Sequence, residues 1–359
     1  MALSAARGSR PRILVGVRIG VLTGGGDCPG LNAVLRAIVR KGERSWGDEI
    51  VGFLDAWDGV RERRTVPLTI ESMRGTLPRG GTVLGTRRGS PFDDPDGVRE
   101  IEATVADMGL DAMIVIGGNG TLTVACRLHS ELGLPIVGVP KTIDNDIVGT
   151  DVTFGFNTAV QIATDAIDRL HTTAESHDRV MVVEVMGRHS GWIATQAGIA
   201  GGAAVVLIPE IPFDIDEVCD RITRRHERGR YASIVVVAEG AMPKEGSIDI
   251  GARDIDRFGH VRLGGIGYVV ADEIGRRTGF DTRPVLLGHV QRGGTPTAFD
   301  RVLATRLGLA AIDAAHEQRF GMMPALKGSK IELVPLGDAV AELRTVPDEE
   351  FAAAEAFFG

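Results

Sequence analysis

Two segments in the first third of the chain repeat one pattern, an apolar run followed by a glycine-rich loop and an amphipathic stretch. Residues 17–23 lead into 24–30, and residues 113–116 lead into 117–121, with a helical pattern over 121–132. A strand followed by a helix is the unit of parallel α/β sheets, and a glycine loop between them places backbone N–H groups where phosphate binds. The pattern predicts an α/β fold with phosphate-binding loops. A tight turn between strand and helix is the alternative explanation of the first loop.

The segment Pro140–Asp146 (PKTIDND) follows another apolar run, residues 136–139. We expect its proline to end that strand, because proline cannot donate to a ladder. Thr142, Asp144 and Asp146 would then lie on a loop at the carboxyl end of the strand, where ligands bind in open α/β sheets. Two carboxylates beside a lysine and a hydroxyl can support acid–base chemistry and metal binding. Alone, the segment is explained slightly better as an Asx-rich turn, but three converging loops favour phosphoryl transfer.

The second half of the chain repeats apolar runs with polar residues at their ends, which predicts a second α/β lobe beginning near Phe156. Among these runs we expect a strand over residues 180–185 and a strand-like segment over residues 283–289. Four arginines, a glutamate and a histidine flank these runs: Arg179, Arg188, Glu239, Arg283, His289 and Arg292. Arginine forks phosphate oxygens and glutamate accepts hydroxyl groups, so the set suits a phosphosugar site. His289 alone is better explained as a structural histidine. Arg87 and Arg88, on a glycine-rich loop, suit a polyphosphate site and a solvated loop equally. The tail from about Leu303 begins as an Ala-rich helix without evident chemistry.

Composition excludes several classes of function. The 359 residues favour two lobes, and the net charge of −8 argues against nucleic-acid binding. No apolar run approaches the length that spans a membrane. Three scattered cysteines without metal-binding spacing fit a reducing cytoplasm. Residues 1–16 lack a signal-peptide core and are interpreted as a disordered extension.

Six motifs together resemble those of the phosphofructokinase family, specifically the bacterial type of 6-phosphofructokinase. They are LTGGGDCPGLNA (22–33), GGTVLGTRR (80–88), IGGNGTL (116–122), PKTIDND (140–146), VEVMGRHSGW (183–192) and GHVQRGGTP (288–296). They occur in the order that the family has and span nearly the whole chain beyond Val17. As a set they are highly specific.

The resemblance implies the phosphofructokinase fold, with two Rossmann-like α/β/α lobes and the active site in the cleft between them. Residues 17–155 plus about 291–341 would form the lobe that binds the phosphoryl donor and Mg²⁺. Residues 156–290 plus about 342–359 would form the lobe that binds the sugar phosphate. The implied reaction is a step of glycolysis, in which ATP phosphorylates the 1-hydroxyl of fructose 6-phosphate to give fructose 1,6-bisphosphate.

The resemblance also implies roles for individual residues. Asp144 resembles the family's catalytic base, and Thr142 and Arg188 would act near the transferred phosphoryl group. Asn119 and Asp146 would hold Mg²⁺. The other implied donor-binding residues are Gly25, Arg88, Gly118, Gly120, Thr121 and Lys141. The other implied substrate-binding residues are Arg179, Met186, Gly187, Glu239, Arg283, His289 and Arg292. Arg179 and Arg283 match arginines that reach the site of a neighbouring subunit, which implies a homotetramer.

Three positions bear on the phosphoryl donor. Asn119 stands where ATP-using members carry a magnesium-binding aspartate, so we expect weaker Mg²⁺ binding and slower turnover. Gly120 matches ATP-using members, because a bulkier acidic residue there would crowd the α-phosphate. Lys141 instead matches pyrophosphate-using members, and the pairing of this glycine with this lysine is similar to an actinobacterial mixed-substrate group. A bulky residue at position 120 would exclude ATP by its size, which is harder to evade than the charge that Lys141 adds. Gly120 therefore weighs more than Lys141, and we expect ATP to be the donor.

Three alternatives remain open at this stage. One is a pyrophosphate-dependent phosphofructokinase, and another is the same chemistry on a different sugar phosphate, such as sedoheptulose 7-phosphate. The third, from another class of protein, is a catalytically impaired regulatory paralogue. Asn119 alone supports that alternative, whereas the intact Asp144, Thr142 and Arg188 argue against it.

The resemblance extends incompletely to the family's effector site. Arg36 and Arg40 match arginines of that site, and Arg228 and Arg230 stand where the site has lysines. His171, however, stands at another effector arginine, and Ala204 replaces an effector-site glutamate. We therefore expect activation by ADP to be weak or absent.

Overall fold

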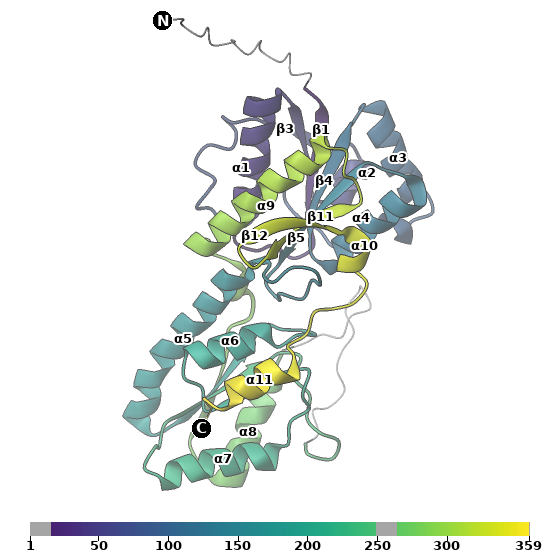
Figure 1. The fold of residues 1–359 in the computed structure, drawn as a ribbon. Coiled ribbons are helices and arrows are strands. Elements are labelled where there is room, and N and C mark those ends of the chain that lie inside the picture. The colour runs from purple at the N-terminus through teal and green to yellow at the C-terminus, as the bar shows by residue number, and fades with distance from the viewer. Residues whose placement is uncertain (1–15, 249–263, 359) are drawn as a thin grey trace, which may run out of the picture.

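The computed structural model describes residues 16–248 and 264–358, so residues 1–15 of the expected extension lie outside the described part of the chain. The chain forms two α/β lobes, each built on its own sheet (Figure 1). The predicted α/β class is confirmed. No helix in the described ranges combines the length and the apolar character needed to cross a membrane.

The larger sheet is mostly parallel and lies in the first lobe. Its strands are β1 (Arg18–Gly24), β2 (Glu49–Phe53), β3 (Thr65–Leu68), β4 (Ala112–Gly117), β5 (Ile136–Thr142), β6 (Phe154–Gly155), β11 (Met322–Lys327) and β12 (Lys330–Pro335). Their order is β12-β11-β5-β4-β1-β2-β3, with β6 paired to β5. Only β3 and β12, at the two edges, run antiparallel to their neighbours. The carboxyl ends of β1, β4 and β5 therefore meet at one edge of this sheet.

Helices cover both faces of this sheet because its central strands are apolar on both sides. In β4, Ile114 and Ile116 face one core cluster, whereas Met113 and Val115 face the other. The helices around the sheet are α1 (Leu31–Lys41), α2 (Trp57–Arg61), α3 (Gly97–Asp107), α4 (Asn119–Leu132), α9 (Ala298–His316) and α10 (Leu336–Ala339). The first cluster includes α1 and α9, and the second includes α2, α3, α4 and α10. A π-helical turn, η1 (Gly42–Trp46), and a 3-10 turn, η2 (Pro91–Asp93), complete the lobe.

The second lobe has a smaller sheet that is parallel throughout. Its order is β10-β7-β9-β8, with bounds β7 (Val180–Val185), β8 (Val205–Leu207), β9 (Ser233–Ala238) and β10 (Thr282–Leu286). The helices are α5 (Phe156–His177), α6 (Trp192–Ala200), α7 (Ile215–Glu227), α8 (Ile266–Thr278) and α11 (Asp348–Glu355). Core contacts place α5 and α6 on one face and α7 and α8 on the other, and α11 packs beside α6.

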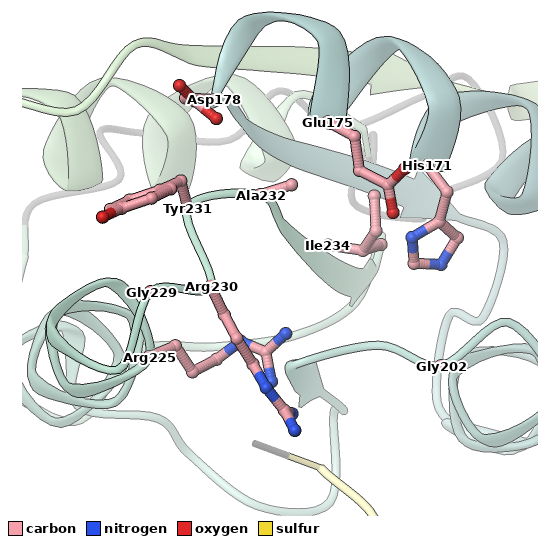
Figure 2. Close-up of a pocket in the computed structure, with 10 residues that line it drawn as sticks. All are labelled: His171, Glu175, Asp178, Gly202, Arg225, Gly229, Arg230, Tyr231, Ala232 and Ile234. Carbon is pink, nitrogen blue, oxygen red and sulfur yellow. The ribbon is translucent and has the colours of Figure 1, made fainter.

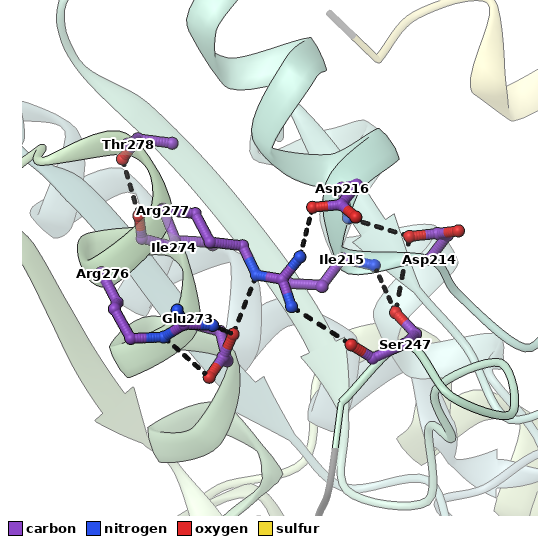
Figure 3. A network of polar contacts seen from close by, with 9 residues as sticks. All are labelled: Asp214, Ile215, Asp216, Ser247, Glu273, Ile274, Arg276, Arg277 and Thr278. Carbon is purple, nitrogen blue, oxygen red and sulfur yellow. Dashed lines mark hydrogen bonds and ion pairs between the residues drawn. The ribbon is translucent and has the colours of Figure 1, made fainter.

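A polar network on the outer side of this lobe joins α7 to α8 (Figure 3). Arg277 of α8 pairs with Glu273 at 2.9 Å and with Asp216 of α7. The same guanidinium donates to the Ser247 carbonyl at 3.1 Å, and Ser247 Oγ accepts from Ile215 N at 2.9 Å. The network fixes the loop before residue 248 against the start of α7, away from the cleft between the lobes.

Two local expectations are wrong. Pro140 does not end its strand, since β5 continues to Thr142. The strand accommodates the proline by changing partner there, because pairing with β4 ends at Gly117–Pro140 and pairing with β6 begins at Lys141–Phe154. Lys141 and Thr142 thus lie on the strand itself. His289, expected on a strand-like segment, lies in the 3-10 helix η3 (Gly288–Arg292), because β10 ends at Leu286.

The chain passes between the lobes three times. The first passage joins β6 to α5, the second joins η3 to α9, and the third joins α10 to α11. All three lie close to the carboxyl end of β5 or to loops that contact it. Segments from both lobes can therefore contribute to one site.

Candidate active site

A pocket of about 710 Å³ opens where the carboxyl ends of β1, β4 and β5 face the second lobe. The predicted site residues that line it are Gly25, Arg88, Gly118, Asn119, Gly120, Thr121, Lys141, Thr142, Asp144, Asp146, Arg188 and Arg292. The loops that follow three strands of the first lobe thus converge, as the sequence predicted. Residues from the second lobe line the same pocket. Its volume is in the range of pockets that bind small organic ligands.

Hydrogen bonds join two glycine loops at one wall of the pocket. Gly25, with φ of 79°, donates from its N–H to the Arg87 carbonyl at 3.1 Å, and Thr86 Oγ1 donates to the Gly25 carbonyl at 2.6 Å. A Cβ at Gly120 would meet no described heavy atom within 4 Å. Gly120 therefore leaves open space beside the start of α4, and the backbone N–H groups of that helix end remain accessible.

Two cations hold the first glycine loop from the side of the pocket. Lys141 is buried, and its Nζ donates to the Gly26 carbonyl. Arg292 Nη1 donates to the Asp27 carbonyl at 3.3 Å. Burial lowers the pKa of Lys141, and the charge of Arg292 lowers it further. The positive groups therefore line the wall where an anionic ligand would lie.

The carboxylates of Asp144 and Asp146 line the same pocket as these cations. Burial raises the pKa of Asp144, although the charges of Arg292, Lys141 and Arg188 oppose the shift. Burial and the charge of Asp144 raise the pKa of Asp146 to about 6. A carboxylate whose pKa is raised toward neutrality is a stronger base at physiological pH.

Three buried oxygens in this group have no hydrogen-bond donor among the described residues: Asn119 Oδ1, Asp144 Oδ1 and Asp146 Oδ1. Buried oxygens are normally satisfied, so an unpaired set is typical of a site that binds a cation or a ligand. Carboxylate and amide oxygens are hard ligands that suit Mg²⁺. The described residues hold no cluster of three or more His, Cys, Asp or Glu side chains, so the oxygens available from side chains here are those of two carboxylates and one amide. The residues fit a magnesium ion.

The remaining predicted site residues do not line this pocket. They are Arg179, Met186, Gly187, Glu239, Arg283 and His289. Glu239 nevertheless interacts with the site, since burial and the charge of Asp144 raise its pKa. Arg179 and Arg283 instead pair with Asp281, in the first case at 2.5 Å. His289 is exposed on η3. A single chain thus does not bring the two arginines to the pocket.

The pocket also contains residues that sequence reasoning missed. His189 lines it and, after Arg292, Lys141 and Arg188, opposes the rise that burial causes in the pKa of Asp144. Its position directly after Arg188 in a recognised motif could have identified it. Leu343 also lines the pocket, but it lies in the tail to which no chemistry had been assigned, and no local signal marks it.

A second pocket, of about 390 Å³, lies in the second lobe beside the last turns of α5 (Figure 2). It contains His171 and Arg230 of the predicted effector residues. Figure 2 shows the guanidinium groups of Arg225 and Arg230 close together, across from His171 and Glu175. Burial, and then the charge of Arg230, lowers the pKa of Arg225. Arg36, Arg40, Ala204 and Arg228 do not line this pocket.

Comparisons with known proteins show what the whole chain is similar to. A family model described as phosphofructokinase matches residues 18–315. A pyrophosphate–fructose 6-phosphate 1-phosphotransferase of Streptomyces coelicolor is 58% identical over 96% of this chain and 100% of its own length. An ATP-dependent 6-phosphofructokinase of Corynebacterium efficiens is 55% identical over 96% of this chain and 99% of its own length. The solved phosphofructokinase of Saccharomyces cerevisiae has a TM-score of 0.78 and 35% identity, over 90% of this chain and 45% of the yeast chain.

Proposed function

The chain belongs to the phosphofructokinase family, and from that membership we propose that it is an ATP-dependent 6-phosphofructokinase. It transfers the γ-phosphoryl group of ATP to the 1-hydroxyl of fructose 6-phosphate. The observation that carries the choice of donor is the open space at Gly120 in a pocket of about 710 Å³. A nucleotide needs room beyond its diphosphate, and a side chain at this position would fill it.

Asp144 acts as the base in this proposal. Its carboxylate takes the proton of the 1-hydroxyl, the hydroxyl oxygen forms a bond to the γ-phosphorus, and the bond to the β–γ bridging oxygen breaks to release ADP. Arg188 and Thr142 line the same pocket and stabilise charge on the transferred group, since phosphoryl transfer depends mainly on positioning and charge neutralisation. Asn119 and Asp146 would hold Mg²⁺, which when bound neutralises phosphate charge.

The second lobe supplies the sugar-phosphate contacts in this proposal. Met186, Gly187 and Glu239 follow β7 and β9, and Arg292 lines the pocket. Arg179 and Arg283 would serve the site of a neighbouring subunit in a homotetramer, and His289 would contact the sugar. The lobe divisions near residues 155, 290 and 341 belong to the same proposal.

A second candidate is pyrophosphate as the donor. Lys141 lines the pocket with its ammonium beside the Gly26 carbonyl, where it could contact a compact diphosphate. Relatives at 57–58% identity are named as pyrophosphate-dependent, whereas others at 54–56% are named as ATP-dependent. The names therefore do not decide between the two donors.

The test compares ATP with pyrophosphate in parallel, using purified protein, fructose 6-phosphate and Mg²⁺. We expect turnover with ATP, and we expect Gly120→Asp to reduce activity with ATP far more than binding of fructose 6-phosphate. Turnover with pyrophosphate alone would replace the proposed donor. Turnover with neither, together with measurable binding of fructose 6-phosphate, would favour the impaired paralogue or a different sugar acceptor.

A further inference from the structure

Three consecutive carbonyl groups of the segment 144–146 are held by donors from outside it. Ser190 Oγ donates to the Asp144 carbonyl at 2.9 Å. Arg344 Nη1 donates to the Asn145 carbonyl at 3.2 Å. The backbone N–H of Arg344 donates to the Asp146 carbonyl at 2.9 Å. Asn119 Nδ2 also donates to the Asp146 carbonyl, at 3.3 Å. Arg344 therefore supplies two of the four contacts.

The segment needs such support because its middle residue is strained. Asn145 has φ of 53°, in the left-handed region, and is buried. Its side-chain Oδ1 accepts from Thr153 N at 3.0 Å. A non-glycine residue keeps this conformation only where the surrounding contacts over-determine it. Loss of one contact would thus let the flanking carboxylates, Asp144 and Asp146, move.

Arg344 is anchored in turn to the second lobe. Its guanidinium carbon lies 4.1 Å from the centroid of the Trp192 ring, and Trp192 Nε1 donates to the Arg344 carbonyl at 3.2 Å. Glu210 Oε1 accepts from Gly191 N and from Val346 N, each at 2.9 Å. Stacking fixes the plane of a guanidinium, so its hydrogen bond to Asn145 has a fixed direction.

We propose that Arg344 is a positioning residue for the reaction. The C-terminal strap, residues 341–347, ties the loop that carries Asp144 and Asp146 to the start of α6 in the second lobe. Arg344 acts through that loop, because the pocket is lined by its neighbour Leu343 and not by Arg344 itself. The role assigned to the loop rests on the proposed function, whereas the mechanical coupling does not.

The experiment compares Arg344→Ala, Arg344→Lys and a matched control, Arg18→Ala. Arg18 Nη1 donates to the Met108 carbonyl at 2.6 Å and lies at the opposite end of the larger sheet, so the control removes a similar bond far from the pocket. We expect Arg344→Ala to lower kcat about tenfold, because small misplacements of reacting groups are costly, while KM for both substrates changes less than about twofold. Arg344→Lys should retain part of kcat, since lysine can donate to Asn145 but does not stack as a plane.

Hydrogen exchange provides a readout that does not depend on activity. Peptides covering residues 142–150 should exchange faster in Arg344→Ala than in the wild type or in Arg18→Ala, with the rest of the chain unchanged. Unchanged exchange in these peptides would overturn the inference, whatever the activity does. A kcat loss that matches Arg18→Ala would also overturn it. If the wild type turns over neither donor, the proposed function fails and exchange alone decides whether Arg344 holds the loop.

Discussion

The Asn119 side chain contributes both an acceptor oxygen and an N–H donor to the site. Its Nδ2 donates to the Asp146 carbonyl at 3.3 Å, and its Oδ1 is buried without a donor among the described residues. Aspartate at this position would lose the donor and would place a third carboxylate beside Asp144 and Asp146. Without metal such a cluster is repulsive, whereas Mg²⁺ binds more tightly when more of its ligands are charged.

We therefore predict that the Asn119→Asp variant has a lower Tm in EDTA than the wild type and binds Mg²⁺ roughly tenfold more tightly. The measurement is thermal unfolding over a range of Mg²⁺ concentrations, because a bound ligand stabilises by mass action. Asn157→Asp is the control, since Asn157 pairs with Thr297 at 2.8 Å away from the pocket. An unchanged Mg²⁺ dependence in Asn119→Asp would count against Asn119 as a ligand.

The pKa of Asp146 links the site to stability. Burial and the charge of Asp144 raise this pKa to about 6, whereas an aspartate in the unfolded chain titrates near pH 4. The folded protein therefore binds this proton more tightly than the unfolded chain does. As the pH rises from about 4 to above 6, the protein loses stability, and at neutral pH the ionised carboxylate is destabilising.

Asp146→Asn should accordingly raise Tm at pH 8 in EDTA and should change it little at pH 4. Asp338→Asn, which alters an exposed carboxylate on α10, should have little effect at either pH. Thermal unfolding of both variants and the wild type at the two pH values makes the comparison. The same Tm change for Asp146→Asn at both pH values would show that ionisation of Asp146 is not the cause.

At the scale of elements, one buried carboxylate joins α5 and α9, the helices that follow two of the passages between the lobes. Asp300, in the first turn of α9, is fully buried. Its Oδ2 accepts from Thr158 N at 2.8 Å and from Thr158 Oγ1 at 2.5 Å, in the first turn of α5. Thr297 N donates to the same Thr158 hydroxyl at 3.0 Å. A carboxylate at a helix N-terminus satisfies donors that the helix itself cannot.

We predict that Asp300→Ala lowers the free energy of unfolding by about 2–3 kcal/mol, because it leaves buried donors unpaired. Asp313→Ala, on the same helix, removes a partly exposed pair with Lys41 and should cost about 0–1 kcal/mol. Urea unfolding followed by circular dichroism measures both. Equal costs for the two variants would mean that the Asp300 contacts contribute no more than a surface pair.

Local patterns predicted the elements that a local signal defines. Strand β7 has the predicted bounds, Val180–Val185, because all of its residues except Glu184 are apolar and most are β-branched. Helix α4 begins at Asn119, two residues before the expected start, since the last residues of the glycine loop already form its first turn. The expectation for Pro140 is wrong because strand β6, which begins fourteen residues later at Phe154, supplies the pairing that extends β5.

In the candidate site, too, the residues with a local sequence signal were predictable and those without one were not. Glycine loops and the carboxylate segment were found because each has its own sequence signature. Arg344 was missed because its contacts with Asn145 and Asp146 join residues about 200 positions apart, and nothing in the tail around it indicates chemistry. Arg179 and Arg283 carry a family signature, but within one chain they meet Asp281 and not the pocket.

At the scale of the whole molecule, these two arginines bear on the proposal that neighbouring subunits share their sites. Arg283 is exposed on β10, an edge strand of the smaller sheet, and does not line the pocket that holds Asp144. If Arg283 serves a neighbour, then each site combines Asp144 of one subunit with Arg283 of another. Two variants that damage different halves of such a site can then complement each other.

We predict that Asp144→Asn and Arg283→Ala each lose most activity toward fructose 6-phosphate when assembled separately. In a mixed pair of subunits, one site carries both defects, whereas the other combines the intact Asp144 of one subunit with the intact Arg283 of its partner. Co-refolding an equal mixture should therefore restore a substantial fraction of wild-type activity, and the recovered activity should follow the fraction of hybrid oligomers. Mixing the assembled variants without dissociation is the control. Recovery no greater than the average of the two separate variants would show that each chain completes its own site, and Arg283 would then need another role.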